Sequence, residues 1–367
     1  MFPDRHAFID AKAPNEGGTE LMDNVENKKK LLEYAKSQNA TDIHICAGSP
    51  ISFRIGGKLI PIRKKKLTPE QSKSLSLELL TEGQRAKFEE NLDFDLMWAD
   101  GDARYRINIG YFNGSVGATI RILGGEPSTP EELFLPEMVK VLARTEKGLV
   151  LITGSTSVGK TTTMASMIDV INCTSKKHVI TIEDPIEYVH QNKKGMVRQR
   201  EVGRDTKTFA SGLRAALRQD PDVIAIGEMR DFETIKIALT AAETGILVLS
   251  TLHVISIDKI IERLLSYAPE GGEGILRFLL AEALRGIIHQ ELIPQIGGGQ
   301  RVACEILVAT TGARNIIRRK GDYHLRTVIS TGKKYGMCTM AESVGALLDE
   351  GVISKDAAKS VLVNYSR

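Results

Sequence analysis

A run of glycine, hydroxyl and lysine residues between two apolar segments could bind phosphate groups. Residues 154–161 read GSTSVGKT and fit the pattern G-x-x-x-x-G-K-[ST]. The apolar segment GLVLIT precedes the run, and the helical segment TTTMASMIDVIN continues from its last threonine. Glycines let backbone N–H groups turn inward around phosphate, and a helix N-terminus adds roughly half a positive charge. Because a chance glycine turn rarely has both flanks, the run predicts a loop that binds nucleotide phosphates.

We expect this loop to bind ATP and Mg²⁺. Lys160 can reach the β- and γ-phosphates, and the hydroxyl of Thr161 can bind the metal ion. The expected nucleotide-binding residues are Gly154, Ser155, Thr156, Ser157, Val158, Gly159, Lys160, Thr161 and Thr162.

Carboxylate and imidazole side chains follow three further apolar segments. HVITIE ends in Glu183, VIAIG is followed by Glu228, and ILVLST is followed closely by His253. Because α/β sheets bind ligands at the carboxyl ends of their strands, these side chains should lie beside the phosphate loop. There a carboxylate can polarise water or bind Mg²⁺, and we expect Glu228 to share the metal ion with Thr161. Each residue also has a purely structural alternative. Glu183 can be a solvated turn residue, Glu228 an acidic residue at a helix start, and His253 an ordinary loop histidine.

The composition excludes several classes of protein. The chain has 367 residues, 42% of them hydrophobic and 26% charged, which is typical of globular proteins of two or three domains. It carries 49 Lys and Arg against 46 Asp and Glu, with one Trp and 5% aromatic residues. This balance disfavours a nucleic-acid motor, and we expect no direct nucleic-acid partner.

Cysteine spacing and hydropathy point to a cytoplasmic protein. The four cysteines lie too far apart for a zinc motif, so reduced thiols are expected. No stretch reaches the ~20 apolar residues that span a bilayer, and the first residues lack a signal peptide. Any membrane contact should therefore go through partners. The four cysteines are Cys46, Cys173, Cys304 and Cys338.

The pattern of the chain predicts two domains. Residues 1–20 are expected to be a flexible tail, and 21–122 a small α+β domain with alternating strands such as ARYRINIG and VGATIRIL. The Gly- and Pro-rich residues 123–134 indicate a linker. In 135–367, short apolar strands separated by helical segments predict an α/β domain with a doubly wound parallel sheet. A C-terminal helical part is expected from about residue 290.

The phosphate loop and the segments that lead to Glu183, Glu228 and His253, in this order and at these spacings, resemble the Walker A, Asp box, Walker B and His box of the type II/type IV secretion ATPase superfamily. Within it the sequence is most similar to the PilT-like twitching-motility (pilus retraction) ATPases. The segments VRQREVGRDTKTFASGLRAALRQDPD and GARNIIRR support the resemblance, which extends from about Leu31 to near the C-terminus.

The resemblance implies a RecA-like P-loop domain with C-terminal helices, a PAS-like N-terminal domain and a homohexamer that couples ATP hydrolysis to mechanical work. Glu183, Glu228 and His253 match the glutamates of the Asp box and Walker B and the histidine of the His box. Arg104 and Arg106 match arginines that the family points at the phosphates; without the resemblance they are alternating surface residues of a strand. The implied partners are an inner-membrane pilus platform protein and, as a further candidate, a paralogous motor ATPase, with the ring peripheral at that membrane.

Two departures from the family pattern leave alternatives open. Ser157 stands where glycine is usual and Val158 where serine is usual, and a Cβ at 157 narrows the freedom of the backbone. The extra N-terminal domain and tetracysteine motif of assembly and secretion relatives are missing, which favours the retraction branch. The alternatives are an ATPase of a conjugative pilus or secretion system, and a weakly active accessory subunit that binds a true motor.

Overall fold

The computed structural model describes residues 28–62, 64–100 and 103–365 and divides the chain into two compact units, Met1–Gly125 and Glu126–Arg367. The division lies inside the segment 123–134 where the sequence predicts a linker. The tail predicted for residues 1–20 lies outside the described residues. No helix in the described part of the chain is long and apolar enough to cross a membrane.

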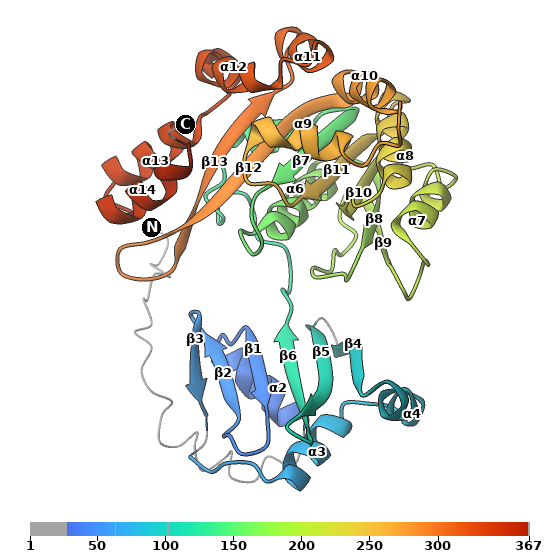
Figure 1. The fold of residues 1–367 in the computed structure, drawn as a ribbon, viewed down its shortest axis with the longest axis vertical. Coiled ribbons are helices and arrows are strands. Elements are labelled where there is room, and N and C mark those ends of the chain that lie inside the picture. The colour runs from blue at the N-terminus through green and yellow to red at the C-terminus, as the bar shows by residue number, and fades with distance from the viewer. Residues whose placement is uncertain (1–27, 63, 101–102, 366–367) are drawn as a thin grey trace. The chain divides into compact units, whose positions relative to one another are not determined.

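In its described residues the first unit is an antiparallel sheet of six strands with three helices, in the strand order β3-β2-β1-β6-β5-β4 (Figure 1). Its hairpins form where glycine permits a positive φ: 77° at Gly114 between β5 and β6, and 79° at Gly57 between β2 and β3. Alternate strand residues such as Ile107 and Ile109 are fully buried, which gives the unit its own core. The elements are α2 (Lys28–Ser37), β1 (Asp42–Ile45), β2 (Ser52–Ile55), β3 (Lys58–Pro61), α3 (Pro69–Leu77), α4 (Glu82–Asn91), β4 (Asp93–Asp100), β5 (Ala103–Phe112) and β6 (Ser115–Ile122).

The second unit is a seven-stranded sheet in the order β13-β12-β7-β11-β10-β8-β9 (Figure 1). All neighbours pair in parallel except β12 and β13, which form an antiparallel pair at one edge. The α/β class with a mainly parallel sheet is therefore confirmed. The strands are β7 (Gly148–Thr153), β8 (His178–Glu183), β9 (Met196–Glu201), β10 (Val223–Glu228), β11 (Leu247–Leu252), β12 (Leu284–Pro294) and β13 (Gln300–Val308).

Helices cover both faces of this sheet. Because side chains of a strand alternate between faces, Leu149 and Leu151 of β7 join one core, and Val150 and Ile152 join the other. Helices α5 and α6 pack on the second of these faces, and α7 to α12 pack on the first. The helices are α5 (Glu137–Ala143), α6 (Lys160–Thr174), α7 (Phe209–Ala216), α8 (Phe232–Glu243), α9 (Ile257–Leu265), α10 (Glu273–Ala283), α11 (Thr311–Arg318), α12 (Leu325–Thr331), α13 (Met340–Asp349) and α14 (Lys355–Leu362), with the 3-10 turns η1 (Asp322–His324), η2 (Lys333–Tyr335) and η3 (Val363–Tyr365).

Two details differ from the sequence-based expectation. The helices after the sheet begin at Thr311 and not at about residue 290, because β12 and β13 occupy 284–308 as a hairpin of the main sheet. Strand β9 was not predicted, since its sequence MVRQRE is mostly polar and lies at the sheet edge. In the second half of the predicted linker, Thr129 and Glu132 exchange backbone-to-side-chain hydrogen bonds of 2.9 and 3.2 Å and order a turn.

Candidate nucleotide-binding site

The predicted phosphate loop joins β7 to α6 and has the backbone that its glycines allow. Gly154 has a φ of 145° and Gly159 a φ of 84°, both in a region that disfavours residues with a Cβ. A Cβ on Gly154 would lie 2.4 Å from the Gln290 carbonyl oxygen, so only glycine fits there. Ser157 also has a positive φ, 64°, which explains why glycine is usual at this position. The backbone at Ser157 thus takes a conformation that favours glycine.

Strand β12 supports the loop from the side through a buried glutamine. The Gln290 side-chain Nε2 donates a hydrogen bond of 2.5 Å to the Val158 carbonyl oxygen. Gln290 is 1% exposed, and its Oε1 atom has no hydrogen-bond partner among the described residues. Val158, the second departure from the family pattern, is itself buried beside this glutamine. Sequence reasoning missed Gln290; its only signal is the polar triplet HQE inside the apolar strand GIIHQELIP.

Lys160 points into the loop from the first turn of α6. Its Nζ atom donates hydrogen bonds to the carbonyl oxygens of Gly154, at 3.1 Å, and Ser155, at 2.5 Å. Burial lowers the pKa of Lys160 to about 8, while the charges of Glu228 and Glu291 raise it. The first N–H groups of α6 have no partner within the helix, so a cation and free N–H donors gather at one point. This is an arrangement that binds phosphate.

Two of the three predicted strand-end residues lie beside Lys160. The Nδ1 atom of His253, just after β11, is 3.2 Å from Lys160 Nζ. Burial lowers the pKa of His253, and the charge of Lys160 lowers it further. Glu228, at the end of β10, forms an ion pair with Arg230 and acts electrostatically on both Lys160 and His253. The parallel sheet therefore brings these side chains to one edge, as expected.

Glu183 is placed differently from a solvated loop carboxylate. It is 6% exposed, and its Oε1 accepts hydrogen bonds from Thr181 Oγ1, at 2.5 Å, and Gln199 Nε2, at 3.1 Å. Burial raises its pKa to about 7, although these two hydrogen bonds oppose the shift. The end of β10 lies close by, since a Cβ on Gly227 would be 3.4 Å from the Glu183 Cα atom. A carboxyl with a pKa near neutrality can exchange protons at physiological pH.

The available metal donors suit Mg²⁺. Thr161 is partly exposed in the first turn of α6, and the Glu228 side chain is 15% exposed. Hydroxyl and carboxylate oxygens are hard donors, which Mg²⁺ prefers. No group of three His, Cys, Asp or Glu side chains that could hold a metal ion occurs among the described residues. The residues present therefore fit an ion that the nucleotide phosphates help to hold.

An apolar hollow of about 240 Å³ adjoins the loop and the start of α6. Its walls come from the turn before α5, from α6 and from the β12–β13 hairpin. At its rim the Arg301 guanidinium lies 3.3 Å from the centre of the Phe134 ring, which is 57% exposed. Such a hollow can take a planar base. Its apolar lining includes Leu133, Leu135, Val158, Leu292 and Val302.

Arg104 and Arg106 lie in the first unit, on one face of β5. Tyr105 and Ile107, the residues that alternate with them, are buried in the core of that unit. Arg106 is exposed, whereas the Nε atom of Arg104 is buried and has no partner in the described part of the chain. The predicted common face is present, and the role of the two arginines at a nucleotide stays a prediction.

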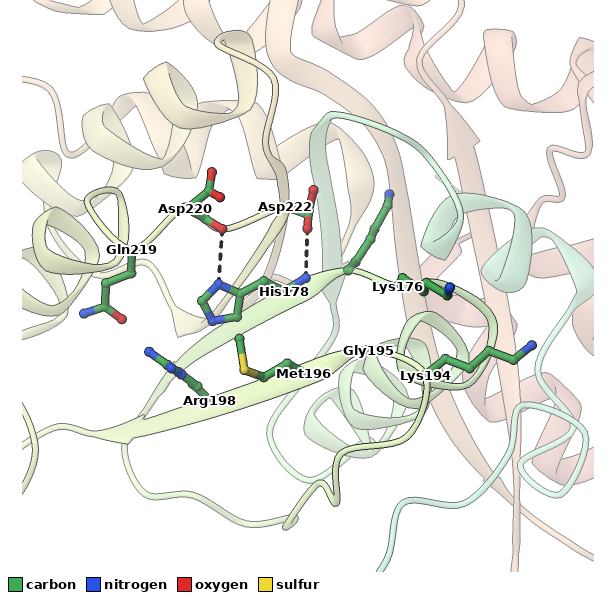
Figure 2. A pocket seen from close by; sticks show the side chains of 10 residues that line it. Lys176, His178, Lys194, Gly195, Met196, Arg198, Gln219, Asp220 and Asp222 are labelled. Atoms are coloured by element: carbon green, nitrogen blue, oxygen red, sulfur yellow. Dashed lines mark hydrogen bonds between the residues drawn. The ribbon is translucent and has the colours of Figure 1, made fainter.

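A polar hollow of about 490 Å³ lies at the other end of β8 from Glu183 and is not part of this site (Figure 2). The ring of His178 donates from Nδ1 to the Asp220 carbonyl oxygen at 3.1 Å, and its backbone N–H donates to Asp222 at 2.8 Å. None of the predicted catalytic residues lines it. The cations around it are Lys176, Lys177, Lys194 and Arg198.

Together, the parallel sheet, the loop that carries Lys160 and the carboxylates at the same edge define a P-loop ATPase of the RecA-like class. Comparison with known proteins gives the family. The family described as "Type II/IV secretion system protein" matches residues 128–343, and the chain belongs to this family. The family predicted from the sequence is therefore confirmed.

Relatives match along nearly the whole chain. The type IV pilus retraction ATPase PilT of Pseudomonas aeruginosa is 42% identical over 331 residues, which are 90% of this chain and 96% of PilT. The type IV pilus ATPase PilU of the same organism is 38% identical over 332 residues, 90% of this chain and 87% of PilU. A crystal structure of the pilus retraction motor PilT with bound ADP superposes with a TM-score of 0.82 at 44% identity, and covers 90% of this chain and 96% of that one.

Proposed function

We propose that this protein hydrolyses ATP to drive the retraction of type IV pili. The observation that carries the proposal is the meeting of Lys160, His253 and Glu228 at the edge of the sheet where the phosphate loop begins. The similarity to PilT over 90% of the chain supports the specific role in retraction. A structure of PilT holds ADP, which supports a nucleotide as the ligand of the loop.

Each side chain has a task in this proposal. Lys160 leaves the loop carbonyl oxygens and pairs with the β- and γ-phosphates, while the N–H groups of α6 and the loop surround them. Thr161 and Glu228 would hold a Mg²⁺ ion, which would neutralise negative charge on the phosphates. The nucleotide base lies in the apolar hollow beside the Arg301–Phe134 pair. Glu183 takes the proton of the attacking water, for which its pKa of about 7 is suitable.

His253 reports the presence of the γ-phosphate. It is already within hydrogen-bond distance of Lys160, the side chain that moves when a phosphate arrives. Arg104 and Arg106 complete the site from the N-terminal unit, because the planar guanidinium group binds phosphate oxygens through two parallel hydrogen bonds. The working form is a homohexamer in the cytoplasm, peripheral at the inner membrane, where it acts on a pilus platform protein.

Two experiments test this function. Deletion of the gene in its host should leave surface pili in place and abolish twitching, and the Lys160→Ala variant should fail to restore it. Loss of secretion or of conjugative DNA transfer with normal twitching would instead identify the motor of another system. Measured hydrolysis by the purified protein tests the second candidate, a weakly active accessory subunit, which the Ser157 and Val158 departures in the phosphate loop favour. ATP turnover near zero with normal folding would support that candidate.

A further inference from the structure

A chain of hydrogen bonds runs from the phosphate loop to the last helical turn of the protein. Thr153, directly before Gly154, lies 3.0 Å from the Nδ1 atom of His289 on β12. The Nε2 atom of His289 lies 2.7 Å from the hydroxyl of Tyr365 in η3. That hydroxyl donates a hydrogen bond of 3.2 Å to the Oε1 atom of Glu291. Thr153 and His289 have no exposed surface, so water cannot replace these partners.

The direction of the hydrogen bonds follows from the one proton of the tyrosine. Because Tyr365 donates to the Glu291 carboxylate, its oxygen must accept from His289, and the imidazole carries its proton on Nε2. The Nδ1 atom then accepts from the hydroxyl of Thr153. Burial lowers the pKa of His289 to about 4, which agrees with a neutral ring that donates at one nitrogen and accepts at the other. Each hydrogen bond from Thr153 to Glu291 therefore joins one donor to one acceptor.

Glu291 lies near the phosphate-binding lysine. Its neighbour Gln290 lies against Gly154 and Val158 of the loop, and the Gly154 carbonyl oxygen accepts a hydrogen bond from Lys160 Nζ. The charges of Glu291 and Lys160 act on each other: each favours the ionised form of the other group. Even so, the two side chains form no ion pair in the described part of the chain; Lys160 binds the loop carbonyl oxygens and His253 instead. A carboxylate that paired with Lys160 would compete with the phosphate groups for the same positive charge. The hydrogen-bond partner that the structure gives Glu291 is the hydroxyl of Tyr365.

We propose that Tyr365 is a positioning residue of the nucleotide site, which restrains Glu291 from pairing with Lys160 and so leaves the lysine free for the phosphates of the ligand. The hydroxyl of Tyr365 binds one carboxylate oxygen of Glu291, and His289 fixes the hydroxyl from the other side. The turn η3 that carries Tyr365 is held by a separate core, in which Leu362 and Tyr365 pack against Ile293 and its neighbours. The C-terminal helices thereby set the phosphate affinity of a loop more than 200 residues earlier in the sequence.

The inference rests on the proposed ATP hydrolysis and is tested with the full chain. Tyr365→Phe keeps the ring and removes only the hydroxyl, so Glu291 becomes free to approach Lys160. We expect the KM for ATP to rise by roughly three- to tenfold, the usual effect of one buried hydrogen bond, while kcat changes by less than about twofold. The double variant Tyr365→Phe with Glu291→Gln should restore the KM, because the competing charge is gone. Tyr323→Phe, at a tyrosine that is 72% exposed, is the matched control and should leave both constants unchanged.

If Tyr365 only stabilises the fold, the KM values of the single and double variants should follow a different pattern. An unchanged KM in Tyr365→Phe would overturn the proposal, and so would a raised KM that persists in the double variant. Calorimetric titration with MgATP should show the same loss and the same rescue in the dissociation constant. If the wild-type protein binds MgATP and hydrolyses none of it, the proposed function fails, while this titration still decides the role of Tyr365.

Discussion

Replacing Glu183 by glutamine should make the protein more stable and less active at the same time. The carboxyl of Glu183 is 6% exposed, and burial raises its pKa from the usual 4.5 to about 7. Between these two pH values the folded protein binds more protons at this group than the unfolded chain does. The free energy of unfolding therefore falls as the pH rises through this window.

The size of the effect follows from the pKa shift. Each pH unit across the window costs about 1.4 kcal/mol, so wild-type protein at pH 8 should have lost about 3 kcal/mol of stability relative to acidic solution. Glutamine has the same shape, can still accept hydrogen bonds from Thr181 and Gln199, and carries no charge. At pH 8 the Glu183→Gln variant should therefore be more stable than wild type by up to about 3 kcal/mol. Near pH 4.5 this advantage should vanish.

Thermal unfolding of both proteins by calorimetry between pH 5 and pH 8 measures this difference. The variant should unfold several degrees higher at pH 8, since ~1 kcal/mol shifts the Tm of a domain of this size by about 2–4 °C. Its ATP turnover should fall by roughly 10²-fold or more, as expected on loss of a general base. Glu243→Gln, at an exposed glutamate of α8, is the control for removal of one charge and should change stability by less than ~0.5 kcal/mol.

Two results would refute this reasoning. Equal stability of variant and wild type at pH 8 would mean that burial does not raise the pKa of Glu183. Full turnover by the variant would mean that Glu183 is neither the base nor an organiser of the metal ion, and would leave Glu228 as the candidate.

Three other variants test the rest of the site. Lys160→Ala should abolish hydrolysis with unchanged circular dichroism, because the charge that pairs with the β- and γ-phosphates from within the loop is lost; turnover within a few-fold of wild type would contradict the phosphate-loop assignment. Gln290→Leu removes the hydrogen bond to the Val158 carbonyl oxygen, and should raise the KM for ATP several-fold while urea denaturation shows a change of only about 1 kcal/mol. The double substitution of Arg104 and Arg106 by alanine should lower kcat by about 10³-fold if the arginines reach the phosphates, and unchanged turnover per site would place them on a merely solvated face.

Much of the nucleotide site was predictable because its chemistry is local in sequence. A loop that surrounds phosphate needs glycines, a lysine and a helix start within eight consecutive residues, and residues 154–161 supply them. The neighbouring strands were predictable for a related reason: strands buried on both faces are short apolar runs, and GLVLIT and HVITIE coincide with β7 and β8. The carboxyl ends of such strands meet at one edge, which located Glu228 and His253.

Local patterns do not tell which distant segments become neighbours. Strand β12 pairs with β7 across more than 130 residues, and this pairing alone places Gln290, His289 and Glu291 beside the loop. Their triplet HQE interrupts an apolar strand. His289 and Gln290 are buried there, and Glu291 is half-buried. Tyr365 is a single aromatic residue near a helix end, and nothing in its surroundings in the sequence relates it to Thr153.

The amino-acid sequence by itself thus determined the class of ligand, the parallel α/β architecture and the candidate residues at the phosphate loop, because each depends on residue types at short spacings. Only the tertiary structure shows the burial of Glu183, the hydrogen bond from Gln290 to the loop and the hydrogen bond from Tyr365 to Glu291. These depend on burial and on hydrogen bonds between segments far apart in the chain. Hydrophobic periodicity specifies which side chains are buried, and only the packed fold specifies their partners.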